Sequence, residues 1–80
     1  MKITYLSAAW CGPCKRFSPV VSVFCAVNGI EFVKLDIENA TELVAKFGVK
    51  SVPFLIFEKD GIETAKSGVM NVSELREFCK

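Results

Sequence analysis

Two cysteines separated by two residues carry the clearest chemical signal in this 80-residue sequence. Cys11 and Cys14 belong to the segment Trp10-Cys11-Gly12-Pro13-Cys14, at the point where a helical pattern begins. The free N–H groups at a helix N-terminus carry partial positive charge and stabilise an anion there. The thiolate is the reactive form of cysteine, and a Cys-X-X-Cys pair at a helix start has a thiol pKa lowered into roughly the 3.5–7.5 range. The spacing therefore predicts a disulfide that closes and reopens without unfolding of the protein.

The hydrophobic pattern predicts the elements that position this pair. A β-like run over residues 3–7 leads into the motif, and apolar residues then recur at spacings of three and four as far as Asn28-Gly29. Pro13 suits the first helical turn, whereas Pro19 is expected to kink the helix. Residues 30–36 alternate with period two, so the segment as a whole predicts a right-handed βαβ unit.

A second helix is predicted in the middle of the chain. Asn39, followed three residues later by Glu42, resembles a capping box that opens a helix over residues 40–47. Gly48 is expected to end this helix.

The last third of the chain predicts a hairpin and a final helix. Residues 53–57 are the most apolar run and are expected to form a central strand, and Lys59-Asp60-Gly61 is a turn signal that pairs residues 62–66 back antiparallel. Asn71 and Glu74 repeat the capping pattern before a helix that reaches Cys79. The predicted order is β-α-β-α-β-β-α.

Composition excludes several classes of function. The ten Lys and Arg residues nearly balance the nine Asp and Glu residues, so nucleic acid and anionic membranes are not expected partners. The absence of histidine removes the commonest general base and metal ligand, and a single close cysteine pair does not fit a zinc site. No apolar run reaches the ~18 residues of a membrane span. The apolar region at the start of the chain is too short for a signal peptide. We expect one domain over residues 1–80, cytoplasmic and monomeric, with no metal and no cofactor.

Taken together, the motifs resemble the thioredoxin family. Trp10-Cys11-Gly12-Pro13-Cys14-Lys15 is similar to the active-site motif of that family, and Val52-Pro53 is similar to its hydrophobic residue and cis-proline opposite the active site. Further matches are the helix-kinking proline, a lysine on the second core strand, the hairpin glycine and the glycine before the last helix, which are Pro19, Lys34, Gly61 and Gly68. The resemblance covers the whole chain. It implies an α/β thioredoxin fold with a four-stranded mixed sheet flanked by helices.

The chain departs from the family pattern in two places. It starts directly at the strand before the motif, so we expect a fold without the usual N-terminal strand and helix. Tyr5 stands where the family usually has a buried aspartate, which is proposed to accept the proton of the buried thiol. Both departures, together with Ser51-Val52-Pro53, lean toward the glutaredoxins.

The resemblance and the spacing together imply roles for the two sulfurs. Cys11, at the exposed start of the helix, is expected to attack a substrate disulfide as the nucleophile and to form a mixed disulfide. Cys14, one turn further and more buried, then attacks the Cys11 sulfur and releases the reduced substrate.

The other motif residues are expected to shape the surroundings of this pair. Gly12-Pro13 restrains the two redox forms, and Trp10 is expected to be a partly exposed lid. Val52-Pro53 is expected to offer backbone hydrogen bonds to an extended substrate, and Gly68 completes the predicted substrate groove. Tyr5 and Lys34 are candidates for tuning thiol acidity, with core packing and an ordinary strand-end charge as the alternatives. Cys25 is expected to be a buried, inert thiol, and the exposure of Cys79 is left open.

The sequence thus predicts a protein-disulfide reductase with protein disulfides as substrates. Its electron donor is a thioredoxin reductase linked to NADPH, or glutathione. Three alternatives stay open: a glutaredoxin-like reductase that depends on glutathione, a binding subunit whose function needs no redox chemistry, and an oxidant that forms disulfides.

Overall fold

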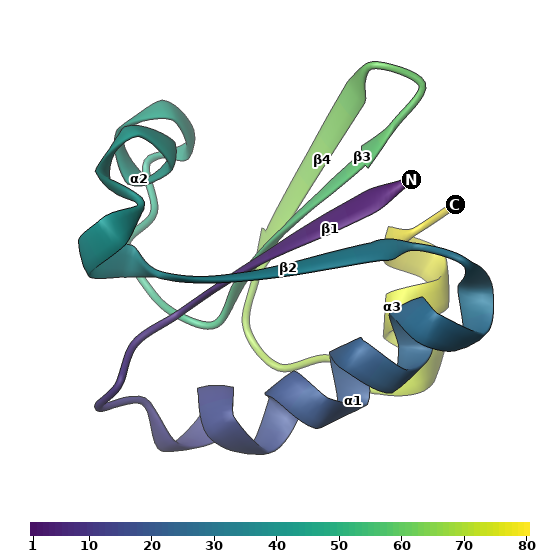
Figure 1. Ribbon diagram of the computed structural model, residues 1–80, viewed down its shortest axis with the longest axis horizontal. Helices are drawn as coiled ribbons and strands as arrows, with labels where there is room; N and C mark the ends of the chain where they lie inside the picture. Colours follow the sequence, from purple (N-terminus) through teal and green to yellow (C-terminus); the bar gives the residue numbers. More distant parts are fainter.

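One mixed sheet organises the chain (Figure 1). The computed structural model describes residues 1–80, and its strands are β1 (Lys2–Ser7), β2 (Glu31–Asp36), β3 (Phe54–Lys59) and β4 (Ile62–Ser67). Their order across the sheet is β2-β1-β3-β4. β1 runs parallel to β2 and antiparallel to β3, and β3 runs antiparallel to β4. The most apolar run of the sequence is therefore an internal strand, as predicted.

Helices cover both faces of this sheet (Figure 1). α1 (Gly12–Asn28) and α3 (Val72–Phe78) lie on one face, and the short 3₁₀ helix η1 (Ile37–Asn39) and α2 (Thr41–Phe47) lie on the other. Side chains alternate between the faces of a strand. In β1, Tyr5 accordingly packs into the core under α1 and α3, whereas Leu6 packs into the core under α2.

α1 begins immediately after the β1–α1 loop and runs for 17 residues. Its N-cap is Cys11, and its C-cap is Gly29, whose φ of 66° lies in the left-handed region that favours glycine. The helix is continuous through Pro19, which has no N–H to donate to the carbonyl of Lys15. The predicted span of the first helix is confirmed.

The β3–β4 hairpin also follows the prediction. Lys59 pairs with Ile62, so the turn consists of Asp60 and Gly61. Both residues have positive φ, 54° and 78°, which is the requirement of a type I′ turn. An aspartate followed by a glycine meets that requirement at low cost.

The capping box predicted at Asn39 is wrong. Asp36 at the end of β2 accepts the Glu38 N–H at 2.8 Å and starts η1, so Asn39 lies inside that 3₁₀ turn. α2 begins only at Thr41, and its N-cap, Ala40, provides no side-chain hydrogen bond. The cap formed instead is Asp36, three residues before Asn39, and it starts η1 rather than α2.

The second predicted capping box is confirmed. The Glu74 N–H donates to the Asn71 side chain at 2.8 Å, and the Asn71 N–H donates to the Glu74 carboxylate at 3.0 Å. Gly48 likewise ends α2 in the left-handed conformation, as predicted. None of the helices combines the length and the apolar character that crossing a bilayer requires.

The two asparagines offer a matched test of capping. Asn71→Ala is expected to lower the free energy of unfolding by about 1 kcal/mol, because it removes the acceptor of an otherwise unpaired helix N–H. Asn39→Ala is expected to change it by less than about 0.5 kcal/mol, since its side chain caps no helix. Urea unfolding of both variants measures the difference, and an equal loss in the two would contradict this assignment of the caps.

Candidate active site

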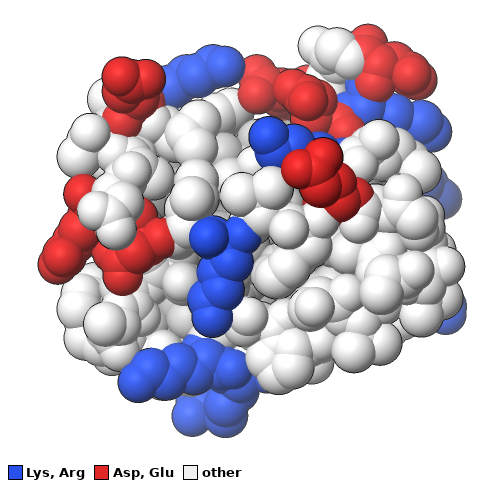
Figure 2. Space-filling view, viewed as in Figure 1, with Lys and Arg blue, Asp and Glu red and all other residues white.

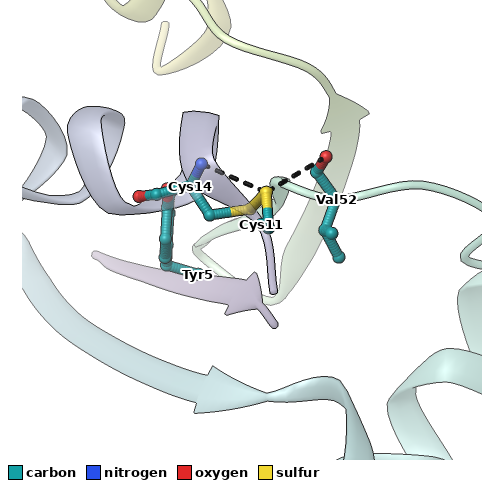
Figure 3. Close-up of a disulfide and its surroundings, with 4 residues drawn as sticks. All are labelled: Tyr5, Cys11, Cys14 and Val52. Carbon is teal, nitrogen blue, oxygen red and sulfur yellow. Dashed lines mark hydrogen bonds between the residues drawn. A yellow bond between two sulfur atoms is a disulfide. The ribbon is translucent and has the colours of Figure 1, made fainter. Parts of the chain in front are cut away.

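The two motif cysteines form a disulfide at the start of α1 (Figure 3). Their Cα atoms are 5.3 Å apart, and the Cys14 N–H donates to the Cys11 sulfur at 3.1 Å. This sulfur is therefore the N-cap acceptor of the helix. In the dithiol form the same N–H faces the sulfur that would carry the negative charge, and such a donor favours a thiolate.

Cys11 is more buried than the sequence predicted. Its exposed fraction is 5%, against 1% for Cys14, so the expectation of an exposed helix start is wrong at this residue. The two cysteines pack with Ala8, and Ile37 and Val52 cover the cluster. The β1–α1 loop and the segment before β3 fold over the sulfur, which is a tertiary arrangement that the motif does not contain.

The segment before β3 lies directly opposite the disulfide (Figure 3). The peptide bond between Val52 and Pro53 is cis, as the resemblance implied, and the Val52 carbonyl oxygen lies 3.9 Å from the Cys11 sulfur. Neither the N–H nor the carbonyl of Val52 makes a backbone hydrogen bond within the chain. Gly68, with a φ of 99°, donates its N–H to the Pro53 carbonyl at 2.8 Å and so holds this segment to the end of β4.

Three of the six predicted groove residues line hollows, and these hollows are separate, whereas Gly12, Pro53 and Gly68 line neither of them. Trp10, 73% exposed, and Val52 line a cavity of about 240 Å³ together with residues of η1, α2 and the loop that follows α2. Pro13 lines a separate hollow with Val69 and Met70 on the other side of the motif. The indole of Trp10 is thus exposed, as expected, and its role as a lid stays a prediction.

Tyr5 contacts the motif through the backbone. Its hydroxyl donates to the Cys14 carbonyl oxygen at 2.7 Å, and its ring packs against Phe17 and Phe32. Burial raises the pKa of Tyr5 to about 12, so the phenol stays protonated at physiological pH. Tyr5 thus connects the first turn of α1 to β1 by a hydrogen bond, and its hydroxyl remains protonated.

A polar cavity lies next to Cys14. It has a volume of about 360 Å³, and its lining residues, besides Cys14, are Ser7, Ala8, Ala9, Lys15, Lys34 and Asp36. Lys34 reaches it from the position paired with Tyr5, and Asp36 from the position paired with Ser7. The sequence analysis named Lys34 and missed Asp36, although the period-two alternation of this strand places both side chains on one face.

The remaining cysteines lie away from the disulfide. Cys25 is fully buried in the core under α1 and α3, as predicted, and Cys79 packs against the same core while half-buried. Burial raises the pKa of each thiol to about 11, and the proximity of Cys25 adds to the shift of Cys79. Neither thiol is paired.

Comparison with known proteins identifies the family. The sequence model described as Thioredoxin matches residues 2–80. The chain belongs to the thioredoxin family. A thioredoxin of Chlamydia muridarum is 43% identical over 61 residues, which is 75% of this chain and 60% of that protein. The chain therefore spans less than two thirds of the length of this relative.

Solved thioredoxin structures agree with the fold. The structure of Fasciola hepatica thioredoxin is 36% identical and superposes with a TM-score of 0.79 over 95% of this chain and 74% of its own. Thioredoxin 1 of Thermosipho africanus has a TM-score of 0.84 over 98% of this chain and 89% of its own at 23% identity. The thioredoxin fold inferred from the sequence is confirmed.

Removing the Tyr5 hydroxyl tests its hydrogen bond in this thioredoxin-family chain. Tyr5→Phe keeps the ring against its aromatic neighbours and is expected to lower the free energy of unfolding of the disulfide form by about 1 kcal/mol, because a buried hydrogen bond is lost. Urea unfolding at neutral pH measures this change. Wild-type stability in the variant would contradict the structural role of the hydroxyl.

Alkaline pH provides the control for the same variant. Because the folded-state pKa of Tyr5 lies at about 12, above its ordinary value of 10.0, its contribution is fully present below pH 10.0 and is lost as the pH rises toward 12. The wild-type protein is therefore expected to lose more stability than Tyr5→Phe over this range. Cys25 and Cys79 titrate in both proteins and cancel in the comparison.

Proposed function

We propose that this chain reduces protein disulfides by dithiol–disulfide exchange. The observation that supports this most strongly is the Cys11–Cys14 disulfide at the N-terminus of α1, opposite Val52, whose N–H and carbonyl make no backbone hydrogen bond. A reversible disulfide needs two sulfurs that stay close in both redox states. A helix turn held to β1 through Tyr5 provides that proximity.

In the first step the Cys11 thiolate attacks a substrate disulfide. The N–H of Cys14 and the partial positive charge of the helix start favour that thiolate over the neutral thiol. An extended substrate segment binds alongside Val52, whose N–H and carbonyl make no backbone hydrogen bond within the chain and supply strand-like hydrogen bonds to it. The product is a mixed disulfide between Cys11 and the substrate, with the second substrate sulfur released.

In the second step Cys14 resolves the mixed disulfide. Its sulfur is held one helical turn from Cys11, so the attack is intramolecular and needs no encounter in solution. The Cys11–Cys14 bond closes, and the remaining substrate sulfur leaves reduced. A reductase partner linked to NADPH then restores the dithiol, with glutathione as the alternative donor.

Trp10 and the cavity beside it extend the proposed substrate contact. Its exposed indole, next to Val52, adds an aromatic surface flanking the peptide, and Gly12-Pro13 and Pro53 keep the backbone around the sulfurs in place. We also propose that residues 1–80 form one domain, and the presence of a single sheet supports this. The unpaired thiols of Cys25 and Cys79 favour a reducing compartment, the cytoplasm, as its location.

Single-cysteine variants test the order of the two sulfurs. Cys14→Ser is expected to accumulate a mixed disulfide between Cys11 and insulin whose disulfides are intact, because no second thiol in the motif resolves this mixed disulfide. Cys11→Ser is expected to trap almost none. Non-reducing electrophoresis and mass spectrometry of the adducts measure this, with Cys79→Ser, a thiol away from the site, as a control that should match wild type. Equal trapping by the two motif variants would overturn the assigned roles.

Insulin reduction with two electron donors tests the proposed activity. We expect turnover with a thioredoxin reductase and NADPH, and loss of turnover in the double variant Cys11→Ser/Cys14→Ser. Turnover with glutathione alone would replace the proposal with the glutaredoxin-like alternative. No turnover with either donor would favour a binding subunit.

A further inference from the structure

The second chemical step requires that the Cys14 thiol lose its proton. Cys14 is 1% exposed, so direct transfer to bulk solvent is restricted. Tyr5, at the position where the family resemblance suggests an acid, does not serve as the acceptor. Its only proton is committed to the Cys14 carbonyl, and with a pKa of about 12 the phenolate is scarcely populated at neutral pH.

The polar cavity beside Cys14 offers another route for the proton. Its volume of about 360 Å³ is large enough for water, which occupies about 30 Å³ per molecule. Asp36 is the only carboxylate among the residues that line it. Proton transfer to a carboxylate needs hydrogen-bond contact, either direct or through one water.

The contacts of Asp36 leave one of its carboxylate oxygens available to accept a proton. One carboxylate oxygen accepts the Glu38 N–H at 2.8 Å and caps η1. The other has no hydrogen-bond partner within the chain, and the side chain projects from the same face of the sheet as Ser7. The cap fixes the carboxylate at the end of β2, beside the cavity.

The other charged groups that face Cys14 are cationic. Lys15 comes from α1 and Lys34 from β2, and both line the cavity. Figure 2 shows basic side chains over the start of α1 and between it and β2, with acidic side chains over η1 and α2 beside them. Positive charge at the cavity favours the thiolate that forms when the proton leaves.

We propose that Asp36 accepts the proton of the Cys14 thiol during resolution, through water in this cavity; the proposal rests on the exchange mechanism above. As the proton moves to the Asp36 carboxylate, the Cys14 sulfur becomes a thiolate and attacks the Cys11 sulfur. The bond between Cys11 and the substrate breaks, the substrate sulfur leaves as a thiolate, and the proton returns to it or to solvent. Cys14 and Cys11 end oxidised and the substrate sulfur ends reduced.

Asp36→Asn separates this role from the structural one. Asparagine is as good an N-cap as aspartate, so η1 keeps its cap while the proton acceptor is lost. Asp60→Asn is the matched control, because it makes the same change of charge in the exposed β3–β4 turn, where asparagine also tolerates positive φ.

The measurement uses a mixed disulfide that forms on the protein itself. The reduced protein is mixed with excess dithiobis-nitrobenzoate, so that Cys11 rapidly acquires a thionitrobenzoate group, and the slower second release of thionitrobenzoate reports the attack by Cys14. Cys11→Ser/Cys14→Ser gives the background from the other two thiols. This readout needs neither a protein substrate nor a reductase, so it stands even where insulin reduction fails.

With Asp36 as the acceptor, the wild-type resolution rate is expected to change little between about pH 6 and pH 8. Asp36→Asn is expected to be about tenfold slower at the lower pH and to gain steeply as the pH rises, because the thiol must then ionise unassisted. Asp60→Asn should follow the wild type. A profile for Asp36→Asn that superimposes on the wild type, or that is lowered by one factor at every pH, would overturn the proposal.

Discussion

The sulfur of Cys11 accepts the backbone N–H of Cys14 at 3.1 Å, so one atom both caps α1 and is the proposed nucleophile. The rest of the site depends on this contact. It fixes where the helix starts, which places Cys14 one turn further with its carbonyl within reach of Tyr5 on β1. Because β1 is an internal strand, the sulfur pair is held by the most buried part of the sheet while its other side faces Val52.

The polar groups around the pair are distributed by the cost of burial. An ionised carboxylate buried without partners is expensive, whereas a phenol with one hydrogen bond is tolerated. In this chain the neutral phenol of Tyr5 occupies the buried position under α1, and the charged groups Lys34 and Asp36 lie at the border of an open cavity. Tyr5 thereby supports the first turn of α1 as a neutral group, whereas Asp36, which also caps η1, lies where its carboxylate can contact water.

Local sequence patterns predicted well wherever a local interaction decides the structure. The Asn71–Glu74 capping box, the Asp60-Gly61 turn and the glycine stops after α1 and α2 all involve residues within a few positions of one another. The prediction at Asn39 failed because Asp36, in the same β2–α2 connection, caps a 3₁₀ turn that includes Asn39. The sequence does not show which of two neighbouring capping residues starts a helix unless the end of the preceding strand is known. Here that strand is β2, and its pairing with β1 extends to Asp36.

The sequence alone determined the reacting pair, its place at a helix start, the order of the elements and the family resemblance, because each depends on short spacings and side-chain type. Only the tertiary structure decided how buried Cys11 is, that the Tyr5 hydroxyl binds the Cys14 carbonyl, and that Asp36 shares a cavity with Cys14. These contacts join residues from different strands, helices and loops. Their distances depend on the register of β1 with β2 and on how the Val52 segment folds back over the helix, neither of which a local spacing encodes.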